Sequence, residues 1–82
     1  MRLTVRYFAS LREALGPGET VELAGGTVAA LRDHLIARGG RHAEALARGR
    51  AVRCAVDQTM SDESAALADG AEVAFFPPVT GG

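Results

Sequence analysis

Segments in which polar and apolar residues alternate run through this chain, and they restrict it to folds built around a β-sheet. The first is RLTVRYF, residues 2–8, in which Leu3, Val5 and Tyr7 share one face. A two-residue period places successive side chains on opposite faces of a strand, so the segment predicts a strand with one buried face. Further strands are expected at residues 19–23, 50–56 and 71–76, with a brief edge strand at 59–60.

One segment alone has the apolar spacing of a long helix. In VAALRDHLIAR, residues 28–38, apolar side chains recur at helical intervals, and Thr27 precedes them as a natural N-cap. Gly39 and Gly40 are expected to end this helix in the left-handed conformation. Two short helices are expected at residues 11–15, with Ser10 as N-cap, and at residues 41–48. The order predicts an α+β fold, a mixed sheet covered on one face by one main helix plus short helices.

A sheet covered on one face leaves the other face open. By the alternation, Phe8 and Phe76 lie on that open face, because their neighbours point into the core. An apolar patch on the uncovered face of a small domain more often marks a partner surface than an accident. We therefore expect Phe8 and Phe76 to bind a partner.

Size and charge bound the class of protein. A chain of 82 residues is one domain, which we place at residues 1–76, with a tail at 77–82. Nine arginines, no lysines and ten acidic residues give a formal net charge of −1, which disfavours nucleic-acid binding. We find no signal peptide and no apolar run long enough to span a membrane. With a single cysteine, Cys54, the chain is expected to be soluble and cytoplasmic.

Few side chains within the domain suggest chemistry. His34 and His42 are interpreted as surface residues of helices, because no cysteine or acid cluster stands at a metal-ligand spacing around them. Cys54 alternates with valines and is expected to be a small buried hydrophobe. The adjacent Asp62 and Glu63 are expected to be solvated in a loop. No metal site and no acid–base pair is predicted.

The C-terminal segment FFPPVTGG differs from an ordinary chain end. Pro77 and Pro78 fix their own φ angles and favour an extended backbone before them, and the β-branched Val79 and Thr80 favour extension too. Gly81 and Gly82 have no side chains, so they fit a channel too narrow for a Cβ atom. The segment predicts a stiff arm that carries the Gly82 carboxylate into another protein's active site.

The segments AVDQTM and LADGAEVAFFPPVTGG together resemble the end of the small subunits of molybdopterin synthase, which are ubiquitin-like sulfur carriers with a β-grasp fold. The resemblance extends more loosely through RYFASLREALG and VAALRDHL. Two turn positions depart from the family pattern, which more often has an acid at Ala71 and an asparagine at Asp57.

The resemblance implies a sulfur-donor subunit with little catalytic machinery of its own. An ATP-dependent activating enzyme would adenylate the Gly82 carboxylate, and a sulfurtransferase would supply persulfide sulfur to make a thiocarboxylate. The arm would then enter the large subunit of a heterotetramer, where sulfur passes to cyclic pyranopterin monophosphate to form the dithiolene of molybdopterin. Gly82 would react, Gly81 would grant passage, and Val79 and Thr80 would contact the channel. No cofactor is expected on the chain itself.

Three other functions fit the same residues. The first is a sulfur carrier for thiazole synthesis or tRNA thiolation, which shares the fold, the tail and the activation. The second is a ubiquitin-like protein modifier; a chain without lysine cannot form lysine-linked polymers of itself, although single conjugation remains open. The third is an interaction module whose tail is inert.

Overall fold

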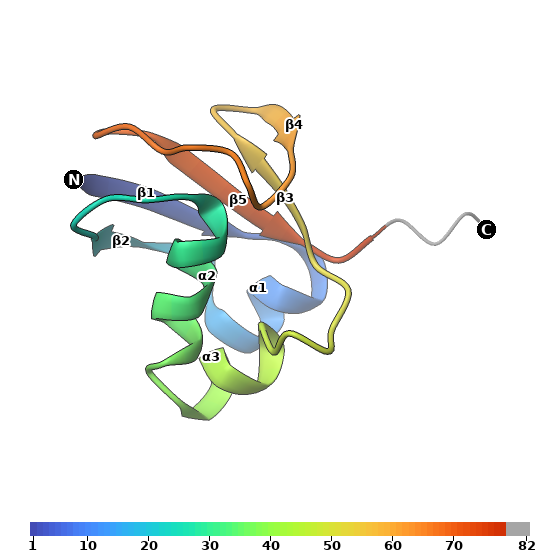
Figure 1. Ribbon diagram of the computed structural model, residues 1–82. Helices are drawn as coiled ribbons and strands as arrows, with labels where there is room; N and C mark the ends of the chain where they lie inside the picture. Colours follow the sequence, from blue (N-terminus) through green and yellow to red (C-terminus); the bar gives the residue numbers. More distant parts are fainter. Residues whose placement is uncertain (79–82) are drawn as a thin grey trace.

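The computed structural model describes residues 1–78 and contains five strands and three helices in that range (Figure 1). Their order is the one expected from the sequence. The elements are β1 (Arg2–Tyr7), α1 (Ala9–Leu15), β2 (Gly18–Glu22), α2 (Val28–Ile36), α3 (Gly40–Ala45), β3 (Arg53–Val56), β4 (Thr59–Ser61) and β5 (Glu72–Phe76).

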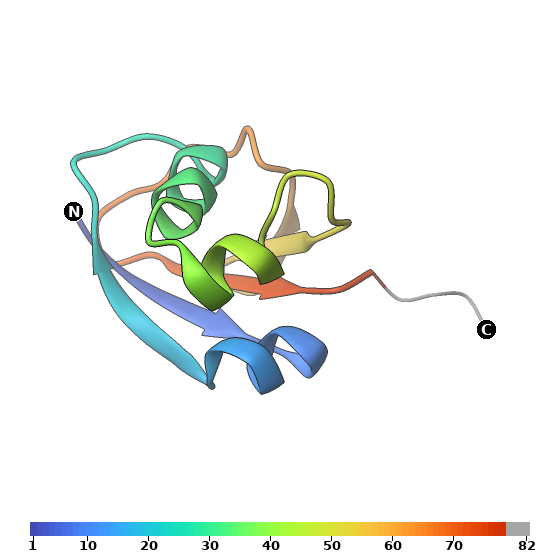
Figure 2. The same ribbon diagram turned by 90° about the horizontal axis from the view of Figure 1, so that it is seen from below.

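The strands form one mixed sheet in the order β2-β1-β5-β3-β4. The central strands β1 and β5 are parallel, with Val5 opposite Val73, and every other neighbouring pair is antiparallel. The three helices lie on the same side of the sheet, as the two views at right angles show (Figures 1 and 2). The prediction of a mixed sheet covered on one face, an α+β fold, is confirmed. Within residues 1–78, every helix falls short of the length and apolar character that a membrane crossing requires.

The core lies between the sheet and the helices. The alternation in β1 and β5 is borne out, because Leu3, Val5, Tyr7, Val73 and Phe75 are all fully buried. They pack against the apolar side of α2 and against the end of α3, represented by Val28, Leu31, Leu35 and Leu46. Burying so many large apolar side chains is the main source of stability in a domain of this size.

The N-cap of α2 and the glycine after its C-terminal end were both predicted from the sequence. The Thr27 hydroxyl accepts a hydrogen bond from the Ala30 amide at 3.3 Å, which is the N-cap contact. Regular helix ends at Ile36, two residues before the expected end, and Gly39 then adopts a φ of +74°. Such a φ strains any residue with a Cβ atom, which explains the glycine.

The predicted start of the first short helix was wrong. Ser10 is not the N-cap; α1 begins at Ala9 and is capped by Phe8, whose carbonyl accepts bonds from the amides of Leu11 and Arg12. The reason is a tertiary contact, because the Phe8 amide still bonds to the Phe75 carbonyl at 3.1 Å. The hydrogen bonding between β1 and β5 therefore extends to Phe8, the residue immediately before the helix.

Strand β3 begins at Arg53, three residues later than expected. The carbonyl of Arg50 accepts a bond from the Arg32 side chain at 3.1 Å instead of joining the strand ladder. Residues 50–52 consequently belong to the connection between α3 and β3. A two-residue turn at Asp57 and Gln58 then links β3 to the short edge strand β4, which was expected.

Candidate functional site

The chain leaves the domain at the C-terminal end of β5. Phe76 is the last strand residue, and the half-buried Pro77 and Pro78 follow it (Figure 1). The four predicted site residues beyond them, Val79, Thr80, Gly81 and Gly82, lie outside the described residues. Their roles, the boundary between domain and tail, and the role of the prolines stay predictions.

Phe8 and Phe76 lie side by side on the face of the sheet that the helices leave open. Tyr7 stands opposite Phe75 in the parallel ladder, which places the next residues, Phe8 and Phe76, next to each other. Tyr7 and Phe75 are fully buried, whereas Phe8 is 39% exposed and Phe76 is partly exposed. Their location on the open face matches the sequence analysis, and their binding of a partner stays a prediction.

Small and flexible apolar residues extend this surface across the sheet. Met60, Ala55 and Ala74 are consecutive partners across β4, β3 and β5. Met60 is 61% exposed, the largest value for a big hydrophobic side chain in the described residues. We call the set formed by Phe8, Ala55, Met60, Ala74 and Phe76 the open-face patch; Ala55 is on this face of the sheet but is only 8% exposed. Sequence reasoning did not select Met60, although its place in the edge strand was the signal.

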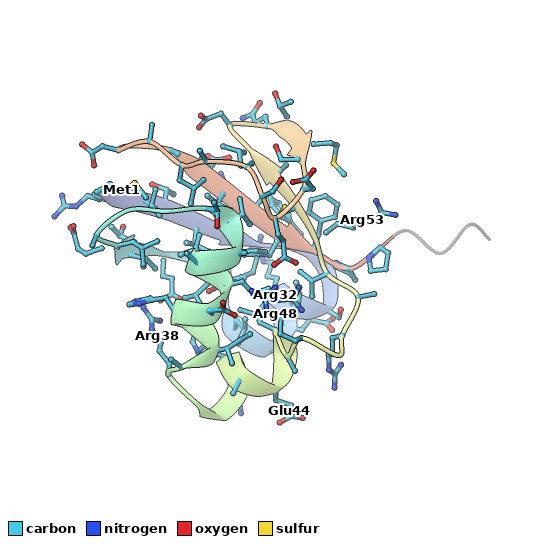
Figure 3. The ribbon with its side chains drawn as sticks, in the orientation of Figure 1. Met1, Arg32, Arg38, Glu44, Arg48 and Arg53 are labelled. Carbon is cyan, nitrogen blue, oxygen red and sulfur yellow. The ribbon has the colours of Figure 1, made fainter. Side chains whose placement is uncertain are left out.

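Two arginines border the open-face patch. The Arg6 guanidinium lies over the Phe8 ring, 5.7 Å from its centroid, which is a cation–π geometry. Arg53 stands opposite Phe76 in the ladder, and Figure 3 shows it beside the C-terminal end of β5. A partner that covers this surface therefore meets aromatic rings and guanidinium groups next to the start of the tail.

The profile of the ThiS family matches residues 5–82, almost the whole chain and the tail with it. The chain belongs to the ThiS family. Over 82 residues it is 48% identical to the molybdopterin synthase sulfur carrier subunit of Escherichia coli K12, covering 98% of this chain and 99% of that protein. The resemblance stated from the sequence is thus confirmed, and this ThiS-family chain groups with the sulfur carrier subunits of molybdopterin synthase.

Solved structures agree on the fold of this ThiS-family protein. SAMP1 from Haloferax volcanii superposes with a TM-score of 0.79 at 25% identity, covering 100% of both chains. A chain in the complex of subunits 1 and 2 of molybdopterin-converting factor from Helicobacter pylori superposes with a TM-score of 0.70. It is 23% identical and covers 100% of both chains, so this likeness shows the fold alone. The ubiquitin-like β-grasp fold is confirmed.

Cys54 plays the structural part expected of it in this family member. Its side chain is 3% exposed, and its thiol donates to the Ser61 carbonyl at 3.3 Å. Burial, together with the nearby carboxylates of Glu63 and Asp62, raises the pKa of the thiol. Thiolate, the reactive form, is therefore disfavoured.

The interpretation of His42 as a simple surface residue was wrong. Its Nε2 lies 2.8 Å from Glu19 Oε2, which also accepts a bond from the Tyr7 hydroxyl at 2.7 Å, and Arg38 binds the other oxygen. Burial alone would raise the pKa of Glu19, but the bonds from Arg38, His42 and Tyr7 outweigh it and lower the pKa to about 2. The cluster joins β2 to the helices and is structural. His34 is exposed, as expected.

The interpretation of Glu63 as a solvated loop residue was also wrong. Glu63 binds Arg32 at 2.6 Å and also pairs with Arg48. Arg32 belongs to α2 and Arg48 to the chain that follows α3, and Figure 3 shows the two side by side. Burial raises the pKa of Glu63, yet the two guanidinium groups lower it overall. Asp62 is exposed, and among residues 1–78 its carboxylate accepts hydrogen bonds only from Ser64. The same range holds no group of three potential metal ligands.

Proposed function

We propose that this chain is the sulfur carrier subunit of a molybdopterin synthase and that the Gly82 carboxylate is its reacting group. The observation that carries the proposal is the 48% identity to a sulfur carrier subunit over nearly the whole chain. The ThiS profile, which reaches Gly82, supports the same assignment. The domain would position the tail, and the chemistry would take place at the tip.

Activation of Gly82 needs a second protein, because a carboxylate is a poor electrophile. An ATP-dependent activating enzyme would convert one carboxylate oxygen into part of an AMP leaving group, with release of pyrophosphate. The outer sulfur of a persulfide on a sulfurtransferase would displace AMP and form an acyl disulfide. A thiol would then attack the other sulfur and break the S–S bond, which leaves a C-terminal thiocarboxylate on this chain and a new disulfide on the thiol. ATP is thus used by the activating enzyme, and this chain binds no cofactor of its own. We place the reaction in the cytoplasm, where ATP is available and where Cys54 stays a free thiol.

The second step takes place in the large subunit. Residues 77–82 would reach about 20 Å if extended, which is enough to carry the thiocarboxylate into a buried active site. Pro77 and Pro78 reduce the conformations that must be lost on insertion, which lowers the ordering cost of binding. Holding the sulfur next to cyclic pyranopterin monophosphate supplies the benefit of an intramolecular reaction. Two carriers would provide the two sulfurs of the dithiolene.

A ubiquitin-like modifier is the second candidate function, because the chain shares its fold with SAMP1, which is small archaeal modifier protein 1. Modifiers and sulfur carriers both use an activated C-terminal glycine, so the fold does not separate them. The higher identity to the E. coli carrier favours the carrier function. A carrier for thiazole synthesis or tRNA thiolation would share the activation and differ only in the acceptor.

Mass spectrometry tests the proposed function directly. We expect incubation with a molybdopterin activating enzyme, ATP and a sulfurtransferase with cysteine to replace one oxygen of the chain by one sulfur. The change should map to the last tryptic peptide. Addition of the large subunit and cyclic pyranopterin monophosphate should then return the carboxylate and yield molybdopterin.

Two comparisons make that result specific. A chain without Gly82 should fold normally and gain no sulfur, since the last strand of the sheet ends at Phe76. If the full chain keeps its mass while a known carrier is charged in the same mixture, the carrier function is wrong. If the chain gains sulfur but yields no molybdopterin, the assignment of cyclic pyranopterin monophosphate as the acceptor is wrong.

The partner surface is tested by Phe76→Asp. A carboxylate within the open-face patch would have to be desolvated on binding, so we expect affinity for the large subunit to fall at least about tenfold, equivalent to about 1.4 kcal/mol. Thr20→Asp is the matched control, because Thr20 lies exposed on β2 at the edge of the same face. Isothermal titration calorimetry measures both. Equal affinities for the two variants would contradict the assignment.

A further inference from the structure

A groove lies between α1 and α3, on the side of the sheet that the helices cover. Its volume is about 330 Å³, and its apolar floor is formed by Leu11 and Ala14 of α1 and Ala45 of α3. Because α1 follows the end of β1 directly, and β1 runs parallel to β5, α1 lies at the C-terminal end of β5 (Figure 2). The groove is therefore on the helix side of the tail, whereas the open-face patch is on the other side.

Two arginines with no acidic partner border the groove. Arg41 of α3 and Arg50 of the following connection both line it. Within residues 1–78 neither forms an ion pair, although Arg2, Arg6, Arg32, Arg38 and Arg48 all do. The lining also contains Glu44, so its charge is mixed and positive overall. Guanidinium groups beside an apolar floor suit a carboxylate that comes with an apolar neighbour.

The length of the tail determines how close a partner must come. An arm of residues 77–82 spans at most about 20 Å, so a channel that receives Gly82 must open close to the domain surface. A channel mouth that surrounded the arm would meet the domain on both sides of the sheet. On one side it would face the open-face patch with Phe76, and on the other the helices that form the α1–α3 groove.

We propose that the α1–α3 groove is a second docking site for the protein whose channel receives the tail. Its occupant is a segment of that protein with a carboxylate next to an apolar side chain; the carboxylate pairs with Arg41 and Arg50, and the apolar group covers Leu11 and Ala14. The inference rests on the proposed function, because it requires a partner that receives the tail. Glu44 argues against a free dianion such as phosphate, which it would repel, and a peptide segment can avoid it.

The double variant Arg41→Gln and Arg50→Gln tests the groove. It removes two positive charges while keeping the side chains long and polar. The matched control is Ala24→Glu with Ala68→Glu, which lowers the net charge by two as well. Both alanines are exposed and lie in the loops after β2 and before β5, at the end of the sheet away from the tail. Thermal melts of the variants check that each one folds.

Affinity for the purified large subunit is measured at about 50 mM and about 500 mM salt. We expect the arginine variant to bind at least about fivefold more weakly than the control at low salt, with a smaller difference at high salt, since salt screens ion pairs. Equal binding of the two variants at both salt concentrations would overturn the proposal. If the two variants bind the large subunit equally while the wild type alone binds inorganic phosphate, the groove is an anion site and not a docking site.

Failure of the groove and failure of the proposed function give different results. If the wild-type chain is charged with sulfur and binds the large subunit, but the arginine variant binds as the control does, only the groove assignment falls. If the wild-type chain neither gains sulfur nor binds the large subunit, the proposed function falls and the groove with it.

Discussion

Arg32 is the one charged residue among residues 1–78 that is almost completely buried, at 3% exposed. Its guanidinium donates to the carbonyls of Leu46, Ala47 and Arg50 and to the Glu63 carboxylate, at distances of 2.6 to 3.1 Å. Carbonyls at the end of a helix have no partner within the helix, so a buried donor there supplies what solvent would otherwise supply. Arg32 therefore fixes the connection that carries Arg50 to the edge of the groove.

Replacing Arg32 with methionine should destabilise the protein strongly. Methionine fills similar space but leaves the carbonyls of Leu46 and Arg50 without their side-chain donor and removes one donor each from the Ala47 carbonyl and the Glu63 carboxylate. We expect this loss to lower the free energy of unfolding by about 3 kcal/mol. Urea denaturation measures the change. Arg12→Met is the matched control, since Arg12 is exposed and unpaired within residues 1–78, and it should change stability by less than about 0.5 kcal/mol. Similar effects of the two substitutions would contradict the role given to Arg32.

The partners of Arg32 explain why sequence reasoning overlooked it. Helical periodicity identified Leu31 and Leu35 as core residues because apolar spacing is local. The acceptors of Arg32 lie 14 to 31 residues further along the chain, and three of the four bonds end on backbone carbonyls, which have no sequence signature. His42 and Glu63 were misread for the same reason, since their partners come from other elements.

At the scale of an element, the turn between β3 and β4 holds a residue, Gln58, in a backbone conformation that its side chain disfavours. Asp57 and Gln58 have φ angles of +48° and +67°, the left-handed pair of a two-residue hairpin. Asp57 tolerates this conformation, and its carboxylate also accepts a bond from the Glu72 amide at 2.9 Å. Gln58 has no such contact among the described residues, and its Cβ atom opposes the left-handed angle.

Gln58→Gly should therefore stabilise the protein. Glycine adopts a φ of +67° without strain, and Asp-Gly is a preferred pair in such turns, so we expect a gain of about 0.5 to 1 kcal/mol. Gln58→Val gives the opposite test, because a β-branched residue is the least suited to this angle and should destabilise. Thermal unfolding distinguishes the three proteins. An order other than glycine, glutamine, valine would contradict the turn geometry.

The sequence predicted which segments form strands and which form helices, but it did not predict the exact residues at which α1 and β3 begin. A two-residue period identifies a strand whatever its partner, so all five strands were expected in the correct order. The starts of α1 and β3 depend on contacts from elsewhere, the Phe75 carbonyl for α1 and the Arg32 side chain for β3. Local patterns do not contain that information.

At the scale of the whole molecule, the sheet order placed the two parts of the proposed interface. Pairing β1 with β5 joins the first and last strands and places Phe8 next to Phe76, which are far apart in sequence. Alternation had placed both on the open face, but neither their neighbouring positions nor the α1–α3 groove could be derived from it. The groove requires two short helices to pack side by side, and that is a tertiary property.

Glu19 links several parts of the molecule, and acid should weaken that link. Tyr7 of β1, Arg38 after α2 and His42 of α3 all contact the Glu19 carboxylate on β2. The pKa of Glu19 is about 2 in the folded protein, against an ordinary value of 4.5. A carboxylate whose pKa is lowered by folding contributes stability that is complete above the unfolded pKa and is lost as the pH falls through the folded one.

Glu19→Gln should accordingly flatten the acid side of the stability profile. We expect wild type to lose free energy of unfolding between about pH 5 and pH 2, as protons bind the unfolded chain in preference, and the variant to lose less over that range. Urea denaturation at a series of pH values measures both. Glu44→Gln is the matched control, because Glu44 is exposed and forms no ion pair within residues 1–78, so its profile should run parallel to that of wild type. If the Glu19 variant runs parallel as well, the cluster contributes nothing to acid stability, and the helices are held to the sheet by apolar packing alone.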